Sequence, residues 1–202
     1  MVPDVAHNNP WADTHPITVA HLLEHTTGFD DIHFVEIGKD DPDITLEQGL
    51  AFHPHSRVSR WPPGTHMSYA NSGPPIAALA LERIAGQKFE AYAGTQVFEP
   101  LGMLNSTFRF PADSHLLAKG YAADGKTSTR YDHILLRPSG ALNTSALDMS
   151  RYLRMMINRG RLDGRQLLRP ETIARMERPA TTLAARAGHQ FGYGLGNEAS
   201  IV

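Results

Sequence analysis

The chain has 202 residues, enough for one domain with a buried core, and its 41% hydrophobic and 20% charged residues are typical of a globular protein. Nineteen Lys and Arg residues against 21 Asp and Glu residues leave a net charge of −2, which does not favour nucleic acid or anionic lipid as a partner. Without cysteine there is no disulfide, Cys nucleophile or thiolate metal site. No apolar run is long enough to predict a membrane span.

Two short helices are predicted near the N-terminus. The first covers 17–25, with Thr18 as its N-cap and an end near Gly28. The second covers 45–53, where Thr45 and the Gln three residues later have the form of a capping box.

The most regular helix follows an irregular segment at 56–72. Asn71 or Ser72 can cap it, two prolines are tolerated because they fall in its first turn, and Gly86 ends it. A shorter helix is predicted at 89–97, ending before a proline. The side chains that recur at helical spacing in the long helix, and are therefore expected to be buried, are Ile76, Leu79, Ala80 and Ile84.

The second half of the chain begins with clusters of Gly, Asp, Ser and Thr at 105–140, which predict loops with at most one hairpin. Ser145 then opens a helix that ends at Gly160, another helix is predicted at 170–176, and 191–196 has the pattern of a strand start. The expected buried stripe of the helix after Ser145 is Leu153, Met156 and Ile157. The whole pattern predicts five or six helices and little sheet.

Three groups of residues have the composition of a chemical site. The run His21-Leu22-Leu23-Glu24-His25 fits H-x-x-E-H, in which two His bind zinc and the Glu activates water. A third zinc ligand would have to come from Glu82, Glu90 or Glu99. The pattern fixes only three residues in a chain with 11 His, so two packed, hydrogen-bonded His at a helix end are the favoured interpretation.

The other two groups are short polar runs. In Ser68-Tyr69-Ala70-Asn71, the tyrosine is a poor base unless a cation lies near it, and the asparagine can both donate and accept hydrogen bonds. Alone, this run indicates only a helix cap. Lys126-Thr127-Ser128 is superficially similar to a Lys-Thr-Gly substrate-binding strand, but turn-forming neighbours favour a solvated loop.

Four segments, taken together and in order, carry a family resemblance. They are Ile17 to Phe29 (ITVAHLLEHTTGF), Pro63 to Asn71 (PGTHMSYAN), Phe98 to Met103 (FEPLGM), and Pro138 to Met149 (PSGALNTSALDM) running on to Asn158-Arg159-Gly160. They resemble the serine β-lactamase-like family, which groups class C β-lactamases, DD-peptidases and related esterases. The matches span nearly the whole chain.

The resemblance implies an α+β fold of the β-lactamase/transpeptidase-like type, of which this mainly α chain covers the helical lobe with little of the antiparallel sheet. It implies that Tyr69 takes the proton-transfer position, and that Asn71 contacts the substrate amide and the catalytic lysine. The implied chemistry is acyl transfer, in which a Ser attacks an ester, amide or lactam carbonyl of a small-molecule or peptide substrate. The family uses no metal, which counts against the zinc hypothesis, and no cofactor is implied. Its members are often periplasmic, secreted or membrane-associated.

The chain departs from the family at the nucleophile. The family's Ser-x-x-Lys motif is absent, because the residues three positions before Lys39, Lys88, Lys119 and Lys126 are Glu, Ala, Leu and Ala. In the family this motif lies upstream of the first matching segment, and the closing Lys-Thr-Gly or His-x-Gly element lies downstream of the last. A Gly-x-Ser-x-Gly nucleophile is absent too.

Residues 1–202 are therefore expected to form a partial domain, inactive alone. The alternatives are a non-catalytic ligand-binding module around Tyr69 and Asn71 and, less favoured, a zinc peptidase. Helices that normally pack on the missing sheet would expose apolar surface, so self-association through that face is expected.

Overall fold

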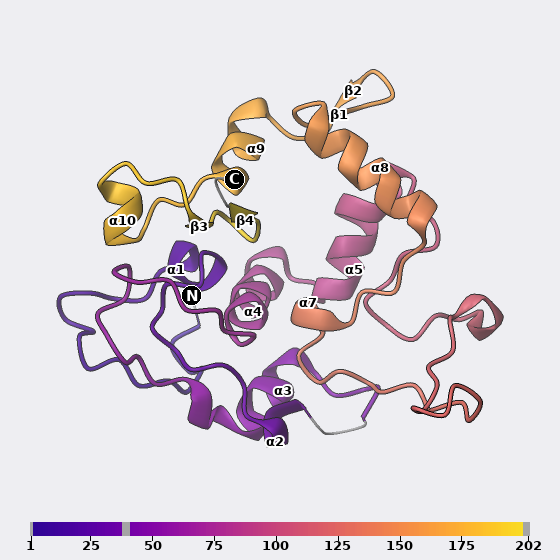
Figure 1. Ribbon diagram of the computed structural model, residues 1–202, viewed down its shortest axis with the longest axis horizontal. Helices are drawn as coiled ribbons and strands as arrows, with labels where there is room; N and C mark the ends of the chain where they lie inside the picture. The colour runs from indigo at the N-terminus through magenta and orange to yellow at the C-terminus, as the bar shows by residue number, and fades with distance from the viewer. Residues whose placement is uncertain (1, 38–40, 200–202) are drawn as a thin grey trace.

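The computed structural model describes residues 2–37 and 41–199, and most of their regular structure is helical (Figure 1). The strands form two short antiparallel pairs: β1 (Arg161–Leu162) with β2 (Arg165–Gln166), and β3 (Gly192–Tyr193) with β4 (Glu198–Ala199). The helices are α1 (Val19–Leu23), α2 (Phe34–Ile37), α3 (Leu46–Phe52), η1 (Pro54–Ser56), α4 (Gly73–Ala85), α5 (Phe89–Ala93), η2 (Gly94–Phe98), α6 (Glu99–Leu101), η3 (Ser114–Leu116), α7 (Arg137–Gly140), α8 (Ala146–Ile157), α9 (Pro170–Glu177) and α10 (Leu183–Arg186). Among the described residues, no helix is long and apolar enough to cross a membrane.

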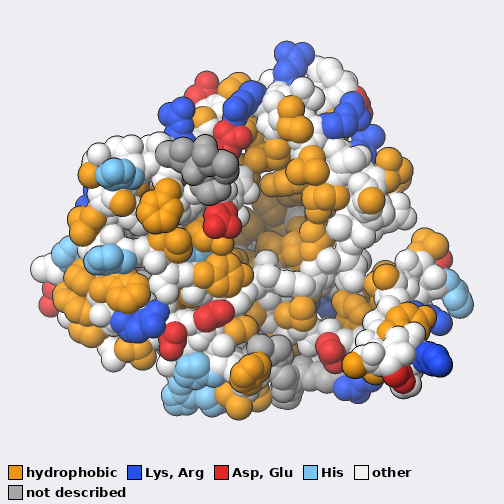
Figure 2. All heavy atoms as spheres, in the orientation of Figure 1, with side chains coloured by type: hydrophobic (Ala, Val, Ile, Leu, Met, Phe, Trp, Pro, Cys, Tyr) orange, Lys and Arg blue, Asp and Glu red, His pale blue; other side chains and the backbone are white. Residues whose placement is uncertain are grey.

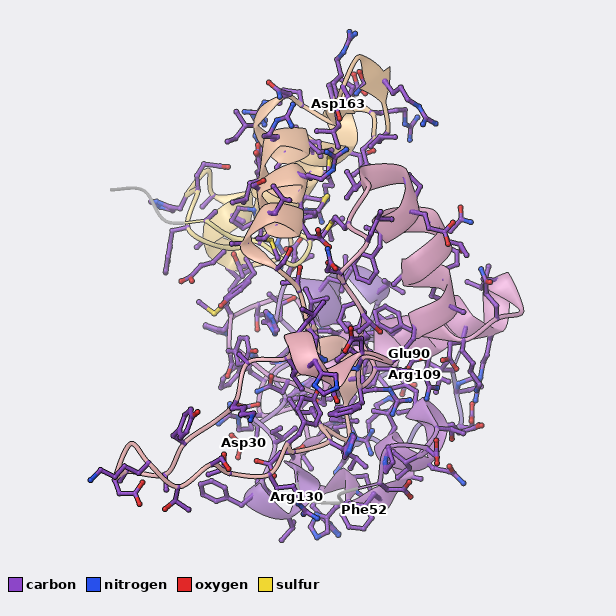
Figure 3. The ribbon with its side chains drawn as sticks, turned by 90° about the vertical axis from the view of Figure 1, so that its right-hand side faces the viewer. Asp30, Phe52, Glu90, Arg109, Arg130 and Asp163 are labelled. Carbon is purple, nitrogen blue, oxygen red and sulfur yellow. The ribbon has the colours of Figure 1, made fainter. Side chains whose placement is uncertain are left out.

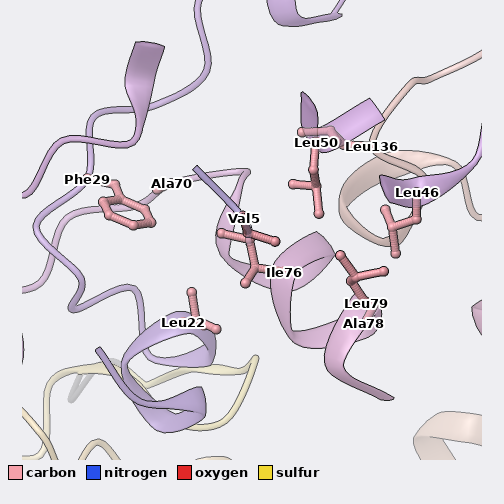
Figure 4. Packing of buried hydrophobic residues seen from close by; sticks show 10 residues of the cluster. All are labelled: Val5, Leu22, Phe29, Leu46, Leu50, Ala70, Ile76, Ala78, Leu79 and Leu136. Carbon is pink, nitrogen blue, oxygen red and sulfur yellow. The ribbon is translucent and has the colours of Figure 1, made fainter. Parts of the chain in front are cut away.

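The first hydrophobic core surrounds α4 (Figure 4). This helix contacts α1, α3, α5 and α7, and Gly86 ends it in the left-handed conformation with φ of 68°. Gly73 allows α4 to approach α1 closely, because a Cβ atom at this position would collide with the carbonyl oxygen of Leu22. The buried members of this core are Val5, Leu22, Phe29, Leu46, Leu50, Ala70, Ile76, Ala78, Leu79 and Leu136.

The second hydrophobic core is formed mainly by side chains of α5, η2, α6, α8 and α9. The helix predicted at 89–97 extends further, because α5 passes through the π-helical turn η2 into α6, which Gly102 ends with φ of 67°. Pro100 does not stop it, since it lies in the first turn of α6, where its missing N–H is not needed. The buried members of this core are Ala93, Phe98, Leu101, Met103, Met155, Leu162 and Ile173.

Several helix ends lie where the capping residues of the sequence predict them. The predicted caps Thr18 and Thr45 both form complete capping boxes, at the starts of α1 and α3. α1 is shorter than expected, since it ends at Leu23 and His25 already has a positive φ of 53°. Ser145 caps α8 by accepting from the backbone N–H of Asp148, as predicted. The predicted α9 and the strand start that becomes β3 are also present.

The N-terminus of α4 differs from the prediction. Ser72 occupies the N-cap position, but neither it nor Asn71 caps the helix with its side chain. The reason is local: a cap side chain accepts from the second or third backbone N–H of a helix, and Pro74 and Pro75 have none. Ile84, predicted to be buried, is 69% exposed at the far end of α4.

The face that α8 buries was also predicted wrongly. Leu153 and Ile157 are 52% and 78% exposed, and Met156 is only partly buried, whereas Met155 is buried in the second core. α8 packs on that core from one side, where the partly buried Tyr152 and Met156 lie with the buried Met155. Of the apolar stripe that the sequence predicts, Leu153 and Ile157 are left exposed and only Met156 packs against this core.

The segment 105–140 is mostly loop, as predicted, but it also contains the unpredicted short helices η3 and α7. Arg109 of this loop lies beside Glu90 of α5, with 3.9 Å between Nη2 and Oε2 (Figure 3). The buried Arg137 of α7 also pairs with Glu90, and it donates to the carbonyl oxygen of Ile44 at 2.9 Å. These bonds hold α7 against α5 and against the segment that precedes α3.

Candidate functional site

Three segments meet at His25, directly after α1. The backbone N–H of Ser68 donates to the His25 carbonyl oxygen at 2.8 Å, and the N–H of Ala70 donates to His25 Nδ1 at 3.2 Å. The imidazole ring also contacts the rings of Tyr69 and Tyr193, each with 4.5 Å between centroids. The buried His25 therefore holds the segment before α4 and strand β3 together at one place.

The side chains of Tyr69 and Asn71 are hydrogen-bonded to each other in this site. The Tyr69 hydroxyl donates to Asn71 Oδ1 at 2.9 Å. Asn71 Nδ2 donates to both carboxylate oxygens of Asp31, at 3.0 and 3.2 Å, and its backbone N–H donates to Asp31 Oδ1 at 2.9 Å. Ser139 Oγ donates to the Asn71 carbonyl oxygen at 2.5 Å. The structure thus brings the two predicted site residues together and fixes the asparagine at every polar group.

The electrostatic surroundings make Tyr69 a proton donor at neutral pH. Partial burial, the Asp31 carboxylate and Tyr193 all raise the pKa of its phenol. Burial lowers the pKa of His25, so its ring is neutral and its Nδ1 can accept from Ala70. A phenol in this setting accepts a proton only if a cation is brought beside it.

Glu24, the middle of the zinc-peptidase pattern, is completely buried and bonded to the C-terminal part of the chain. It pairs with Arg175 and accepts from the backbone N–H of Ala180 at 3.0 Å and of Thr181 at 2.8 Å. Burial alone would raise the pKa of Glu24, but these bonds outweigh it and hold the pKa below its ordinary value. Glu24 is therefore a structural carboxylate that ties α1 to the segment after α9.

The other residues of the zinc hypothesis are also used by the fold. Nδ1 of His21 accepts from the backbone N–H of Thr18 in the capping box. Glu82 accepts from the Phe89 N–H at 2.9 Å, while Glu90 pairs with Arg137 and Glu99 is exposed. Within residues 2–37 and 41–199, no group of three or more His, Cys, Asp or Glu is arranged to hold a metal ion. The geometry gives the zinc hypothesis no support.

Lys126-Thr127-Ser128 forms part of an exposed turn, as predicted. Asp124 accepts from the backbone N–H groups of Lys126 and Thr127, at 2.8 and 2.9 Å, and from the Thr127 hydroxyl at 2.6 Å. These bonds, led by the Thr127 hydroxyl, lower the pKa of Asp124 to about 2. Tyr121 and Ser128 close the turn with an antiparallel bridge. The run is not a substrate-binding strand.

Two residues of the site were not identified from the sequence. Asp31 follows the first matching segment by two positions, so its place in the chain was the available signal, but its contact with Asn71 joins residues 40 apart. Tyr193 comes from the predicted strand start and reaches the site through the ring of His25. Of the lysines tested for a Ser-x-x-Lys motif, Lys39 lies outside the described residues, and Lys88 lies 3.4 Å from Glu82.

Comparison with known proteins gives a consistent result. The family model described as Beta-lactamase matches residues 3–201. The chain is 26% identical over 97 residues to a penicillin-binding protein of Bacillus subtilis (strain 168), covering 43% of this chain and 20% of that protein. It is 30% identical over 111 residues to a human protein called putative beta-lactamase-like 1, covering 54% of this chain and 22% of that protein.

Solved structures match almost the full chain. The octameric penicillin-binding protein homologue from Pyrococcus abyssi has a TM-score of 0.65 and 23% identity, covering 95% of this chain and 47% of that one. EstCE1, a hydrolase with promiscuous acyltransferase activity, has a TM-score of 0.69 and 20% identity, covering 97% of this chain and 59% of that one. The chain thus spans about half of each structure and about a fifth of each of the two sequence relatives.

Proposed function

The chain belongs to the beta-lactamase family, and on that premise we propose that it is the central, mainly helical part of a serine hydrolase that works through an acyl-enzyme. Its fold is the predicted α+β fold of the β-lactamase/transpeptidase type, of which this chain supplies mostly helices and two small antiparallel sheets. The observation that carries the proposal is the hydrogen bond between Tyr69 and Asn71, in a chain without Ser-x-x-Lys.

The roles of these two side chains are those that the family resemblance implies. In the complete enzyme, a serine hydroxyl forms a bond to the carbonyl carbon of an ester, amide or lactam, and the leaving group departs with a proton; water then releases the acyl group. Tyr69 transfers protons at this site, and a lysine ammonium beside it would lower its pKa enough for it to accept one. The resemblance assigns Asn71 to the substrate amide and to that lysine, a role that requires its side chain to give up part of its bonding to Asp31 and Tyr69. Because serine and lysine come from outside these 202 residues, the chain alone is inactive.

Exposed apolar surface supports the idea of an incomplete lobe. Figure 2 shows a hollow near the middle of the molecule, with hydrophobic side chains on its floor and on its right-hand wall. Large apolar side chains that are exposed on the long helices and on the loop after α6 are Ile84, Leu104, Leu147, Leu153 and Ile157. Such surface favours association with the remainder of the enzyme or, in its absence, with a second copy of the chain.

Covalent labelling tests the absence of a nucleophile. The chain is incubated with a fluorescent penicillin and with a fluorophosphonate, and adducts are mapped by mass spectrometry, with an intact family member as the positive control. We expect labelling of the control and no specific labelling of any serine in the chain. Specific labelling of one serine would overturn the proposal that the nucleophile lies elsewhere.

The coding sequence on either side of the chain tests the other half of the proposal. We expect an in-frame Ser-x-x-Lys upstream and a Lys-Thr-Gly or His-x-Gly element downstream. The extended protein should then hydrolyse an activated ester, and Tyr69→Phe should reduce its turnover by about 10²–10⁴-fold. An extended protein that is active and insensitive to Tyr69→Phe would remove Tyr69 from the proton-transfer role.

A non-catalytic ligand-binding module is the second candidate, and the electrostatics of the site favour it specifically. Tyr69 has a raised pKa and His25 a lowered one, so both are neutral groups suited to holding a ligand by hydrogen bonds. In that case, a peptidoglycan peptide or acyl ligand should raise the melting temperature, and Tyr69→Phe should abolish the shift. If no ligand raises the melting temperature, the binding module is excluded and the proposal of a partial serine hydrolase remains.

Self-association is tested by light scattering coupled to size-exclusion chromatography. We expect dimers or larger species whose fraction grows with concentration and falls when Leu153 and Ile157 are both replaced by Ser. Replacing the exposed Leu116, on the separate loop at 105–140, is the matched control and should change nothing. A chain that stays monomeric at all concentrations would contradict this part of the proposal.

A further inference from the structure

The first turn of α4 cannot supply the usual donor to the backbone carbonyl oxygen of Asn71. The carbonyl oxygens of the residues on either side, Ala70 and Ser72, accept from backbone N–H groups three and four residues further along, each at 3.3 Å. For Asn71, those two positions are Pro74 and Pro75, which have no N–H. Because backbone carbonyl groups in folded proteins are nearly always paired, Asn71 requires a donor from elsewhere in the chain.

Ser139 of α7 supplies this donor. Its hydroxyl donates to the Asn71 carbonyl oxygen at 2.5 Å, although 68 residues separate the two in the sequence. The two residues meet because α7 lies beside α4 (Figure 1). A serine side chain on one helix thus takes the place of the backbone N–H that the prolines remove from another.

α7 is a firmly held support for this hydroxyl. The two leucines directly before the helix are 1% and 6% exposed, so the chain enters α7 from the core. Its first residue, Arg137, is buried as well, pairs with Glu90 of α5, and donates to the Ile44 carbonyl oxygen at 2.9 Å. The position of Ser139 is therefore set by the packing of α7 on neighbouring segments and does not depend on Asn71.

The bond from Ser139 differs from the side-chain bonds of Asn71 in what a substrate would do to it. The Asn71 side chain is bonded to Tyr69 and Asp31, and these bonds must partly open before the side chain can take a substrate amide. The Ser139 hydroxyl bonds the backbone and can stay in place throughout. Because a peptide group is planar, holding its carbonyl oxygen fixes the direction in which the Asn71 side chain leaves the backbone.

We propose that Ser139 is a positioning residue for the proposed acyl-transfer reaction. Its hydroxyl replaces the helical N–H that Pro74 and Pro75 cannot supply, and it holds the Asn71 backbone so that the side chain is aimed at the substrate amide. Ser139 acts through Asn71 and does not touch the substrate. This inference rests on the proposed function, because it takes Asn71 as the residue that contacts the substrate.

NMR of the ¹³C,¹⁵N-labelled chain tests the bond and its effect on the side chain. Ser139→Ala should move the Asn71 carbonyl carbon to a lower chemical shift, since the oxygen loses its donor, and should change the two Nδ2 proton signals. Ser139→Thr keeps a hydroxyl and should retain the wild-type signals. Pro75→Ala, combined with Ser139→Ala, returns an N–H four residues after Asn71 and should restore the signals in part.

Ser150→Ala is the matched control. The Ser150 hydroxyl also donates to a backbone carbonyl oxygen, that of Leu147 at 2.6 Å, but it belongs to α8, so its loss should leave the Asn71 signals unchanged. Thermal unfolding verifies that each variant is folded. Asn71 signals that ignore Ser139→Ala, or that respond equally to Ser150→Ala, would overturn the inference. Loss of the wild-type signals in both Ser139→Thr and the double variant would also overturn it.

Two substrates of the extended protein distinguish positioning from a general loss of stability. Ser139→Ala should lower kcat/KM about tenfold for an N-acyl amino-acid ester, whose amide Asn71 contacts, and less than about twofold for an activated ester without an amide. Equal losses for the two esters would overturn the inference. An extended protein that forms no acyl-enzyme from either ester would refute the proposed function, whereas the NMR signals of the chain decide separately whether Ser139 positions Asn71.

Discussion

The two longest helices, α4 and α8, have similar apolar patterns but different surroundings. α4 is enclosed by α1, α3, α5 and α7, and its Ile76, Leu79 and Ala80 are buried as their spacing predicts. α8 contacts the second core on one side through Met155 and the partly buried Tyr152 and Met156. Leu153 and Ile157 of its predicted stripe are exposed. An apolar stripe indicates which face a helix is able to bury, and the rest of the fold decides whether that face is covered.

The candidate site and the exposed apolar stripe lie on different helices. The site residues lie on the α4 side, where segments from three parts of the sequence converge on His25. The exposed stripe, Leu153 and Ile157, lies on α8. The exposed stripe of α8 is therefore the surface that the proposed remainder of the enzyme would be expected to cover.

The largest expected effect comes from truncating the core residue Leu79 of α4, with the exposed Ile157 of α8 as the comparison. Leu79→Ala in α4 removes a side chain that is only 3% exposed, so it should lower the free energy of unfolding by about 2–5 kcal/mol. Ile157→Ala in α8 should change it by less than about 0.5 kcal/mol, because this side chain is already in solvent. Urea unfolding at low protein concentration measures both. Equal losses would mean that the stripe of α8 is covered in solution.

Replacing Glu24 is expected to change the free energy of unfolding by a smaller amount, and this change should depend on pH. Glu24→Gln should cost about 1–3 kcal/mol, since it weakens the bonds to Arg175 and Thr181 that hold the C-terminal segment on the α4 side. A carboxylate with a lowered pKa stabilises the fold above its unfolded pKa and loses this contribution as pH falls through the folded one. The gap between wild type and variant should therefore close as pH falls below the ordinary value of 4.5. Glu99→Gln, at an exposed position, should show no such gap at any pH.

The N-caps of the two helices should respond in opposite ways. Ser145→Ala removes the bond to the Asp148 N–H at 3.1 Å and should destabilise the chain by about 1 kcal/mol. Ser72→Ala should be neutral or slightly stabilising, because its buried Oγ has no hydrogen-bond partner within the part of the chain that the structure describes. Thermal unfolding of both variants under the same conditions measures the two changes in stability. A clear loss with Ser72→Ala would show that its hydroxyl is bonded in solution.

The helix ends that were predicted correctly from the sequence are those determined by residues within one helical turn. The cap at Thr18, the capping box at Thr45, the cap at Ser145 and the stop at Gly86 each depend on neighbours in the chain, and all four are present. The side-chain cap expected at α4 failed for an equally local reason, because Pro74 supplies no N–H to it.

The features that sequence reasoning missed depend on residues far apart in the sequence. The bond from Thr181 to Glu24 spans 157 residues, and those from Asn71 to Asp31 span 40. Local pattern gives Glu24 a place in a zinc motif and gives Asp31 no role, because neither pattern contains the donors that the fold brings to these carboxylates. Motif order identified Tyr69 and Asn71 as a pair, whereas their electrostatic surroundings required the tertiary structure.

The smallest expected effect concerns the ionisation of Tyr69, on the α4 side. Burial is the largest cause of its raised pKa, and the Asp31 carboxylate is the next. Asp31→Asn should therefore lower the pKa of Tyr69 while leaving it above the ordinary value of 10, since the burial is unchanged. Ultraviolet titration of each protein, with the corresponding Tyr69→Phe variant subtracted, isolates this phenol. Asp30→Asn should leave the titration unchanged, because Asp30 is paired with Arg60 at 3.4 Å; an equal shift in both variants would show that the site responds to net charge and that the contact between Asp31 and Asn71 has no special part in it.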